Sequence, residues 1–185
     1  MYNYLVYLSN EFWHKMNVKI LKIAGNVLVD AKISDSKLLK INLPSVTDGW
    51  RFNFNKHSKK KGFETYVLVC EETPEKIEGC LIFEMKSKIE PYMAFVEIAP
   101  HNKGKDKEYE KVAGCLIAFA CRLSFKNGKD DYRGFLAFDV MEENKEDEEK
   151  LMGLYSAKYG AYRLGETTMV ILPEGGEKLI NDFLN

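Results

Sequence analysis

The stretch from residue 92 to residue 128 constrains the fold more than any other part of the chain, because it predicts a strand, a loop and a long helix in succession. Residues 92–98 form an apolar run that is typical of a buried strand. Residues 99–108 are polar and contain Gly and Pro, which predicts a loop. From Tyr109 onward the apolar residues recur at helical spacing, on a stripe formed by Val112, Leu116, Ala120 and Leu123. A strand that leads into a helix N-terminus often binds phosphate there, because the first N–H groups of a helix have no partners inside it.

The other predicted elements place this unit inside a single domain that spans residues 1–185. The pattern predicts a helix at 11–23 with Asn10 as its cap and Gly25-Asn26 as its end, an extended piece at 38–43, strands at 26–33, 64–70, 77–85, 135–138 and 167–172, and helices at 142–159 and 177–184. Short links favour an antiparallel meander for the three strands between residues 64 and 98. The strand–helix–strand unit at 92–138 implies a parallel pair. The predicted fold class is therefore α+β, with a mixed sheet covered by helices.

The composition excludes several classes of partner. The net charge is −1, so no global attraction to nucleic acid or to an anionic membrane is expected. No apolar run reaches the roughly 20 residues that span a bilayer, and residues 1–10 have no basic segment of the kind that begins a signal peptide. The four cysteines form no C-x-x-C pair, and no histidine stands at zinc-finger spacing. We therefore expect free thiols in a reducing cytoplasm, no metal site, and neither a nucleic acid nor a membrane as partner.

Two further segments allow alternative interpretations. Residues 50–54 alternate aromatic and polar side chains, which fits a strand that lines a pocket and fits equally well aromatic rings that pack on a core. Trp50, Phe52 and Phe54 could also anchor a protein partner. The acidic cluster at 142–149 opens a predicted helix, where negative charge is favourable, and we interpret it as structural.

Three segments resemble the GCN5-related N-acetyltransferase (GNAT) superfamily: residues 96–100 (VEIAP), 109–120 (YEKVAGCLIAFA) and 154–161 (LYSAKYGA). The resemblance covers roughly residues 64–172 in element order. It implies a mixed, largely antiparallel sheet with a central parallel strand pair, splayed at a cleft that binds acyl-coenzyme A. Glu108 and Lys111 depart from the pattern, since the family has Arg or Gln at the first position and Gly at the second.

The resemblance also implies which residues bind acetyl-coenzyme A as co-substrate. Backbone N–H groups would cup its pyrophosphate along the run Tyr109, Lys111, Val112, Ala113 and Gly114. Ile98 would hydrogen-bond the pantetheine arm, and an N–H near Ile98 or Ala99 would polarise the thioester carbonyl. The ammonium of Lys111 could pair with phosphate in place of the close backbone approach that glycine allows.

Two residues are the candidates for proton transfer. The resemblance implies that Tyr155 protonates the departing thiolate, since a phenol can serve as general acid. Tyr155 could equally pack its ring on the core. For the general base we rank Glu97, on the central strand, above His101, just past the strand end.

The leading hypothesis is an acyl-coenzyme A-dependent N-acetyltransferase. It would transfer an acetyl group to an amine, a small molecule or a protein, by direct attack in a ternary complex. The alternative is a non-catalytic relative that has lost standard acetyl-coenzyme A binding and uses the cleft for another ligand, because the phosphate loop departs from the family pattern at Glu108 and Lys111. A homodimer is possible in either case.

Overall fold

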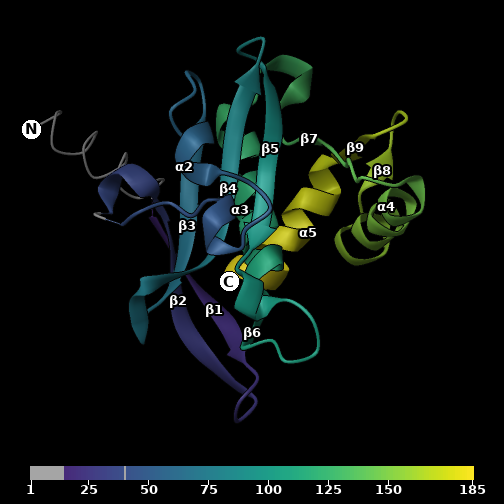
Figure 1. The fold of residues 1–185 in the computed structure, drawn as a ribbon. Coiled ribbons are helices and arrows are strands. Elements are labelled where there is room, and N and C mark those ends of the chain that lie inside the picture. The colour runs from purple at the N-terminus through teal and green to yellow at the C-terminus, as the bar shows by residue number, and fades with distance from the viewer. Residues whose placement is uncertain (1–14, 40) are drawn as a thin grey trace, which may run out of the picture.

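The computed structural model describes residues 15–39 and 41–185, and a nine-stranded sheet forms its centre (Figure 1). The strands are β1 (Lys15–Lys22), β2 (Val27–Asp35), β3 (Glu64–Cys70), β4 (Thr73–Lys86), β5 (Glu90–Ile98), β6 (Tyr109–Glu110), β7 (Leu136–Asp139), β8 (Tyr162–Arg163) and β9 (Thr168–Ile171). The α-helices are α2 (Phe54–His57), α3 (Val112–Asn127), α4 (Lys145–Tyr159) and α5 (Pro173–Leu184). Short 3-10 turns lie at η1 (Ser36–Leu38), η2 (Val46–Asp48), η3 (Pro100–Asn102) and η4 (Asp130–Tyr132).

The strand order is β6-β1-β2-β3-β4-β5-β7-β9-β8. Among these described strands every pairing is antiparallel except that of β5 with β7, which is parallel. The meander β3-β4-β5 and the parallel pair on either side of α3 therefore confirm the predicted fold class. No helix in the described ranges is long and apolar enough to cross a membrane.

Two apolar clusters hold the layers together, one on each face of the sheet. The larger cluster lies between the sheet and the helices α3 and α5, and nearly every residue of α3 from Val112 to Ser124 is buried. The smaller cluster lies on the other face, where Trp50, Phe54 and Phe63 pack on β3, β4 and β5. Figure 1 shows α2 in front of the sheet and α3 behind it, so the sheet is the middle layer.

Gly79 on β4 allows α3 to lie close to the sheet. A Cβ at this position would stand 2.8 Å from both Leu116 Cδ1 and Val112 Cγ1. Both side chains are buried and belong to the first two turns of α3. The start of α3 therefore lies directly over the strand that neighbours β5.

Gly79→Ala is expected to lower the free energy of unfolding by about 1–3 kcal/mol, because the added methyl overpacks a filled interface. Denaturant titration measures the change. Gly153→Ala on α4 is the matched control, since a Cβ there meets nothing within 4 Å and alanine is the better helix former. Equal unfolding midpoints for Gly79→Ala and the wild type would contradict the prediction.

The predicted helix at 11–23 is wrong where the structure describes it. Lys15–Lys22 is strand β1, and Gly25-Asn26 forms the turn of the β1–β2 hairpin, with φ of +88° and +50°. Met16 and Ile20, four residues apart, fit a helical stripe, but an even spacing also fits the alternation of a strand. Val18 and Ile20 are buried while Lys19 is exposed, so the period is two. Asn10 and residues 11–14 lie outside the described residues.

Four other expectations need correction. Residues 38–43 contain no strand in their described part, where η1 ends at Leu38. Residues 50–54 are not a strand, because α2 begins at Phe54; Trp50 and Phe54 pack in the core, which was the second interpretation of this segment. The helix expected from Tyr109 begins at Val112, after the two-residue strand β6, and α5 begins at Pro173, four residues before the predicted start.

Candidate functional site

The parallel strands β5 and β7 are joined at one point and then part. Their register has the single pair Tyr92–Ala137. Beyond it, β7 stays paired with β9 from Leu136 to Asp139, while β5 continues to Ile98 along β4. A wedge therefore opens between two adjacent strands of one sheet.

A cavity of about 90 Å³, here called the strand hollow, lies in this wedge. Its lining residues come from β5, from β7 and the segment after it, from α4 and from the loop before α2: Arg51, Phe52, Met93, Ala94, Phe95, Val96, Phe138, Asp139, Val140, Met141, Glu142, Leu151 and Tyr155. Because the lining includes residues from the cores of both faces, the wedge connects the two sides of the sheet.

Tyr155 of α4 is one wall of the strand hollow. Its ring packs 4.9 Å from that of Phe138 and 5.8 Å from that of Tyr159. Burial raises the pKa of the Tyr155 phenol to about 12; the nearby Glu142 raises it further, and Arg51 acts in the opposite direction. The phenol therefore keeps its proton throughout the physiological range.

Arg51 crosses the mouth of the strand hollow. Its guanidinium donates to the Glu142 carboxylate and, over 2.7 Å, to the Met141 carbonyl oxygen. Arg51 belongs to the loop before α2, whereas its two partners lie between β7 and α4. The side chain thus ties together the two sides of the wedge.

Glu97 faces the same loop but does not line the strand hollow. Its carboxylate accepts hydrogen bonds from the backbone N–H groups of Arg51 (2.9 Å) and Phe52 (3.1 Å) and from Lys103 Nζ (2.6 Å). Glu97 is 8% exposed. These three hydrogen bonds hold neighbouring segments in place.

A second cavity, here called the helix hollow, has a volume of about 350 Å³ and lies at the N-terminus of α3. It is lined by Ile98, Asn102, Lys107, Tyr109, Glu110, Lys111, Val112, Ala113, Gly114, Lys158, Tyr159 and Phe183. The structure thus brings together six of the seven residues predicted to bind the co-substrate. Three lysines and the first N–H groups of a 16-residue helix face one cavity, which is an arrangement suited to an anion.

Lys111 is the N-cap of α3 and has φ of +70°, in the left-handed region that favours glycine. The backbone conformation is therefore the one that glycine would adopt, although a lysine occupies the position. Glu108 points away from the helix hollow and pairs with Lys76 over 2.9 Å. That hydrogen bond lowers the pKa of the Glu108 carboxyl. The Glu108 carboxylate is thus not part of the lining of the helix hollow, whereas the carboxylate of Glu110 is part of it and pairs with Lys107.

Ala99 is the predicted residue that lies elsewhere. It lines a cavity of about 450 Å³ together with Trp50 and His101, and its N–H donates to Glu78 O on β4. Since N–H groups alternate between the two neighbours of a strand, the N–H groups of Val96 and Ile98 point away from β4 and toward the wedge. Of the two N–H groups predicted to polarise a carbonyl, that of Ile98 has the suitable direction.

Gly114 serves helix packing as well as the helix hollow. A Cβ on Gly114 would stand 2.2 Å from the ring of Phe183 on α5. Phe183 therefore lies directly against the first turn of α3 and closes one side of the helix hollow. Sequence reasoning missed this residue because only the folded chain brings α5 to the start of α3.

Sequence reasoning also missed Asn102 and Lys107, and it gave Lys158 and Tyr159 no role in binding. Lys158 and Tyr159 follow Tyr155 by three and four residues, so they share its face of α4. That spacing is a signal that could have identified them. Asn102 and Lys107 carry no such signal, because their place depends on how the loop after β5 folds.

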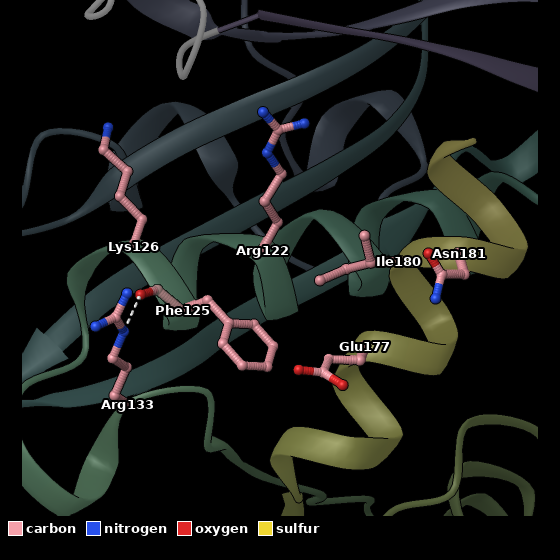
Figure 2. Close-up of a pocket in the computed structure, with 7 residues that line it drawn as sticks. All are labelled: Arg122, Phe125, Lys126, Arg133, Glu177, Ile180 and Asn181. Atoms are coloured by element: carbon pink, nitrogen blue, oxygen red, sulfur yellow. Dashed lines mark hydrogen bonds between the residues drawn. The ribbon is translucent and has the colours of Figure 1, made fainter.

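A larger cavity, of about 700 Å³, lies apart from the wedge, between the C-terminal half of α3 and α5 (Figure 2). Figure 2 shows Lys126 and Arg122 extending from α3, with Glu177 and Asn181 on α5. None of the predicted site residues lines it. No group of three or more potential metal ligands occurs within residues 15–39 and 41–185.

Comparison with known proteins finds likeness in structure alone. No protein-family model matches the chain, and no curated protein matches its sequence. A structure of a KacTA–DNA complex has 14% identity and a TM-score of 0.56, covering 82% of this chain and 99% of that one. Spermidine N-acetyltransferase SpeG from Vibrio cholerae has 20% identity and a TM-score of 0.45, over 70% and 73% of the two chains. AtaTR bound to acetyl-coenzyme A has 15% identity and a TM-score of 0.48, over 68% and 77% of the two chains.

Because the KacTA complex contains DNA, its likeness to this chain gives no support to the expectation that nucleic acid is excluded as a partner.

Proposed function

Because the chain has the fold of the GNAT superfamily, we propose that its wedge transfers an acetyl group from acetyl-coenzyme A to an amine. The observation that supports this most is the pair of cavities along β5. One offers lysines and a helix N-terminus, and the other offers a protonated phenol. A molecule with a phosphate-rich end and a thioester end fits that order along the strand. The proposal takes residues 1–185 as one domain that acts on an acyl donor and an amine acceptor.

The helix hollow would bind the pyrophosphate. The N–H groups of the first turn of α3 have no partners inside the helix and can donate to phosphate oxygens. Lys111 and Lys158 line the same cavity and supply positive charge. Lys107 is already paired with Glu110 over 2.6 Å, so we expect Lys111 and Lys158 to contribute more.

The strand hollow would hold the reacting groups. The amine nitrogen attacks the thioester carbonyl carbon, a C–N bond forms and the C–S bond breaks. The N–H groups of Val96 and Ile98 point toward the wedge and can stabilise negative charge on the carbonyl oxygen. Tyr155 donates its proton to the departing sulfur. The amine proton passes to a base, for which Glu97 is the candidate, and from there back to Tyr155 through solvent.

A non-catalytic role in the same cleft is the second candidate. The observation that favours it is that the carboxylates in or beside the strand hollow already have partners: Glu142 pairs with Arg51, Asp139 accepts from Tyr92 and Thr168, and Glu97 pairs with Lys103. The strand hollow, at about 90 Å³, is also small for two reactants. This candidate predicts a protein that does not bind acetyl-coenzyme A, so one titration separates the two.

Lys111→Glu is expected to weaken acetyl-coenzyme A binding by about tenfold or more, because it replaces an attractive charge near phosphate by a repulsive one. Calorimetric titration of wild type and variant measures the change. Lys105→Glu is the matched control: the residue lies in the same loop and is exposed, but it does not line the helix hollow. No binding to the wild type at millimolar concentration would contradict the proposed function. Equal effects of the two substitutions would contradict the assigned phosphate site.

A further inference from the structure

Glu78 is a buried carboxylate placed by a β-bulge. The pairing of β3 with β4 runs from Leu68–Gly79 to Val69–Ile77, so Glu78 is the extra residue on β4. A bulge redirects a side chain and is frequent beside functional sites. The Glu78 side chain is fully buried. Its direction is therefore set by the fold and not by solvent.

One oxygen of Glu78 holds two consecutive residues of the loop after β5. Oε2 lies 2.6 Å from His101 Nε2 and accepts a 2.7 Å hydrogen bond from Asn102 Nδ2. The backbone of Glu78 contributes as well, because its carbonyl oxygen accepts from Ala99 N–H. Short hydrogen bonds to a carboxylate are stronger than those between neutral groups. The start of the loop is thus fixed to β4.

Asn102 extends this anchor to the end of the loop. Its Oδ1 accepts from Tyr109 N–H over 3.0 Å, and Asn102 is 2% exposed. The N–H of Glu108 also donates to His101 O. Residues 103–107 therefore form a side loop that is closed at its base. The chain enters Lys111 and α3 from a position that Glu78 determines.

The other carboxylate oxygen indicates that this arrangement has a cost. Oε1 of Glu78 is buried and has no hydrogen-bond partner among the described residues. A buried polar atom without a hydrogen-bond partner destabilises the folded state, and such atoms call for an explanation. A smaller apolar side chain would avoid the cost but could not hold His101 and Asn102.

We infer that Glu78 is a positioning residue that fixes the loop between β5 and α3, so that Ile98 and the first turn of α3 face the same ligand. The inference rests on the proposed function for the identity of that ligand. Glu78 does not line the helix hollow, so it acts through His101 and Asn102.

The test combines hydrogen–deuterium exchange of residues 99–111 with titration of acetyl-coenzyme A. In both Glu78→Leu and Asn102→Ala, the exchange rate of the loop amides is expected to rise about tenfold. The affinity for acetyl-coenzyme A is expected to fall about tenfold, which is the effect of one lost hydrogen bond. Glu78→Gln retains an oxygen that can accept from both donors. Its loop exchange and its affinity for acetyl-coenzyme A should therefore be close to those of the wild type. Thr65→Val is the control, since Thr65 is a buried residue of β3 whose hydroxyl has no partner.

Asn102→Ala removes the link to Tyr109 and one hydrogen bond to Glu78, but it leaves Glu78 and its contact with His101 in place, so it tests the anchor even where Glu78→Leu does not fold. Loop exchange equal to that of the wild type would overturn the inference. Raised exchange with unchanged affinity would overturn it too, because the loop would then not position the ligand. If the wild type fails to bind acetyl-coenzyme A, the proposed function fails. Loop exchange alone then decides whether Glu78 fixes the loop. Faster exchange in the variants than in the wild type would support that role, and equal exchange would overturn it.

Discussion

Tyr155→Phe is expected to lower kcat about 100-fold while leaving the affinity for acetyl-coenzyme A within a few-fold of the wild type. The substitution removes only the hydroxyl, so the packing of the ring on Phe138 remains. A thiolate that leaves without a proton is a poorer leaving group, so the loss falls on the chemical step. Steady-state kinetics with an amine acceptor, together with calorimetry of the acyl donor, separate the two quantities.

The raised pKa of Tyr155 supports this role and predicts a pH dependence. Burial is the largest cause of its value of about 12. Burial penalises the charged form of a thiolate in the same place as well, so it raises the basicity of the proton acceptor along with the pKa of the donor. An acid must be protonated to act, and an ordinary tyrosine loses its proton near pH 10. We therefore expect kcat to stay level through pH 10 and to fall only as the pH approaches 12.

Tyr162→Phe is the control for Tyr155→Phe, because Tyr162 is an exposed phenol on β8, close in sequence to α4 but outside both hollows. An equal loss in both variants would show that the effect is not one of proton transfer. An unchanged kcat in Tyr155→Phe would assign the ring to packing, which is the other reading of this residue that the sequence allows.

The fold could be predicted from the sequence where each element carries its own periodicity. Residues 64–98 alternate or run apolar between clear turns, and α3 has an apolar stripe of four turns, so the meander and the parallel pair follow. Strand β1 could not be predicted in the same way, since Met16 and Ile20 satisfy both periods and only the pairing with β2 selects the strand. Tertiary pairing overrides a local pattern of this kind.

The candidate site shows the same division. The run from Tyr109 to Gly114 could be located because a helix N-terminus is a local feature of the chain. Phe183 and Glu78 could not be located, because each acts across the fold, one against Gly114 and the other through Asn102. Neither has a neighbour in sequence that shows what it contacts.

Glu97→Ala is expected to lower the free energy of unfolding by about 3 kcal/mol, because it leaves two partly buried N–H groups and the ammonium of Lys103 without their acceptor. Glu97→Gln should cost about 1 kcal/mol, since its amide oxygen still accepts from one N–H group. Denaturant titration of both variants gives the two values. Glu143→Gln, at an exposed carboxylate on the segment before α4, is the control for loss of charge.

The same two variants distinguish an anchor from a base. A base must present a free lone pair to the amine, whereas the contacts of Glu97 all go to Arg51, Phe52 and Lys103. If Glu97 only anchors the loop before α2, Glu97→Gln should retain kcat within a few-fold, because the anchor mostly survives. If Glu97 accepts the amine proton, Glu97→Gln should lose about 100-fold or more in kcat despite its near-native stability. If stability and turnover both fall slightly in Glu97→Gln and further in Glu97→Ala, Glu97 is the anchor. If turnover is already lost in Glu97→Gln, whose stability is close to that of the wild type, Glu97 is the base.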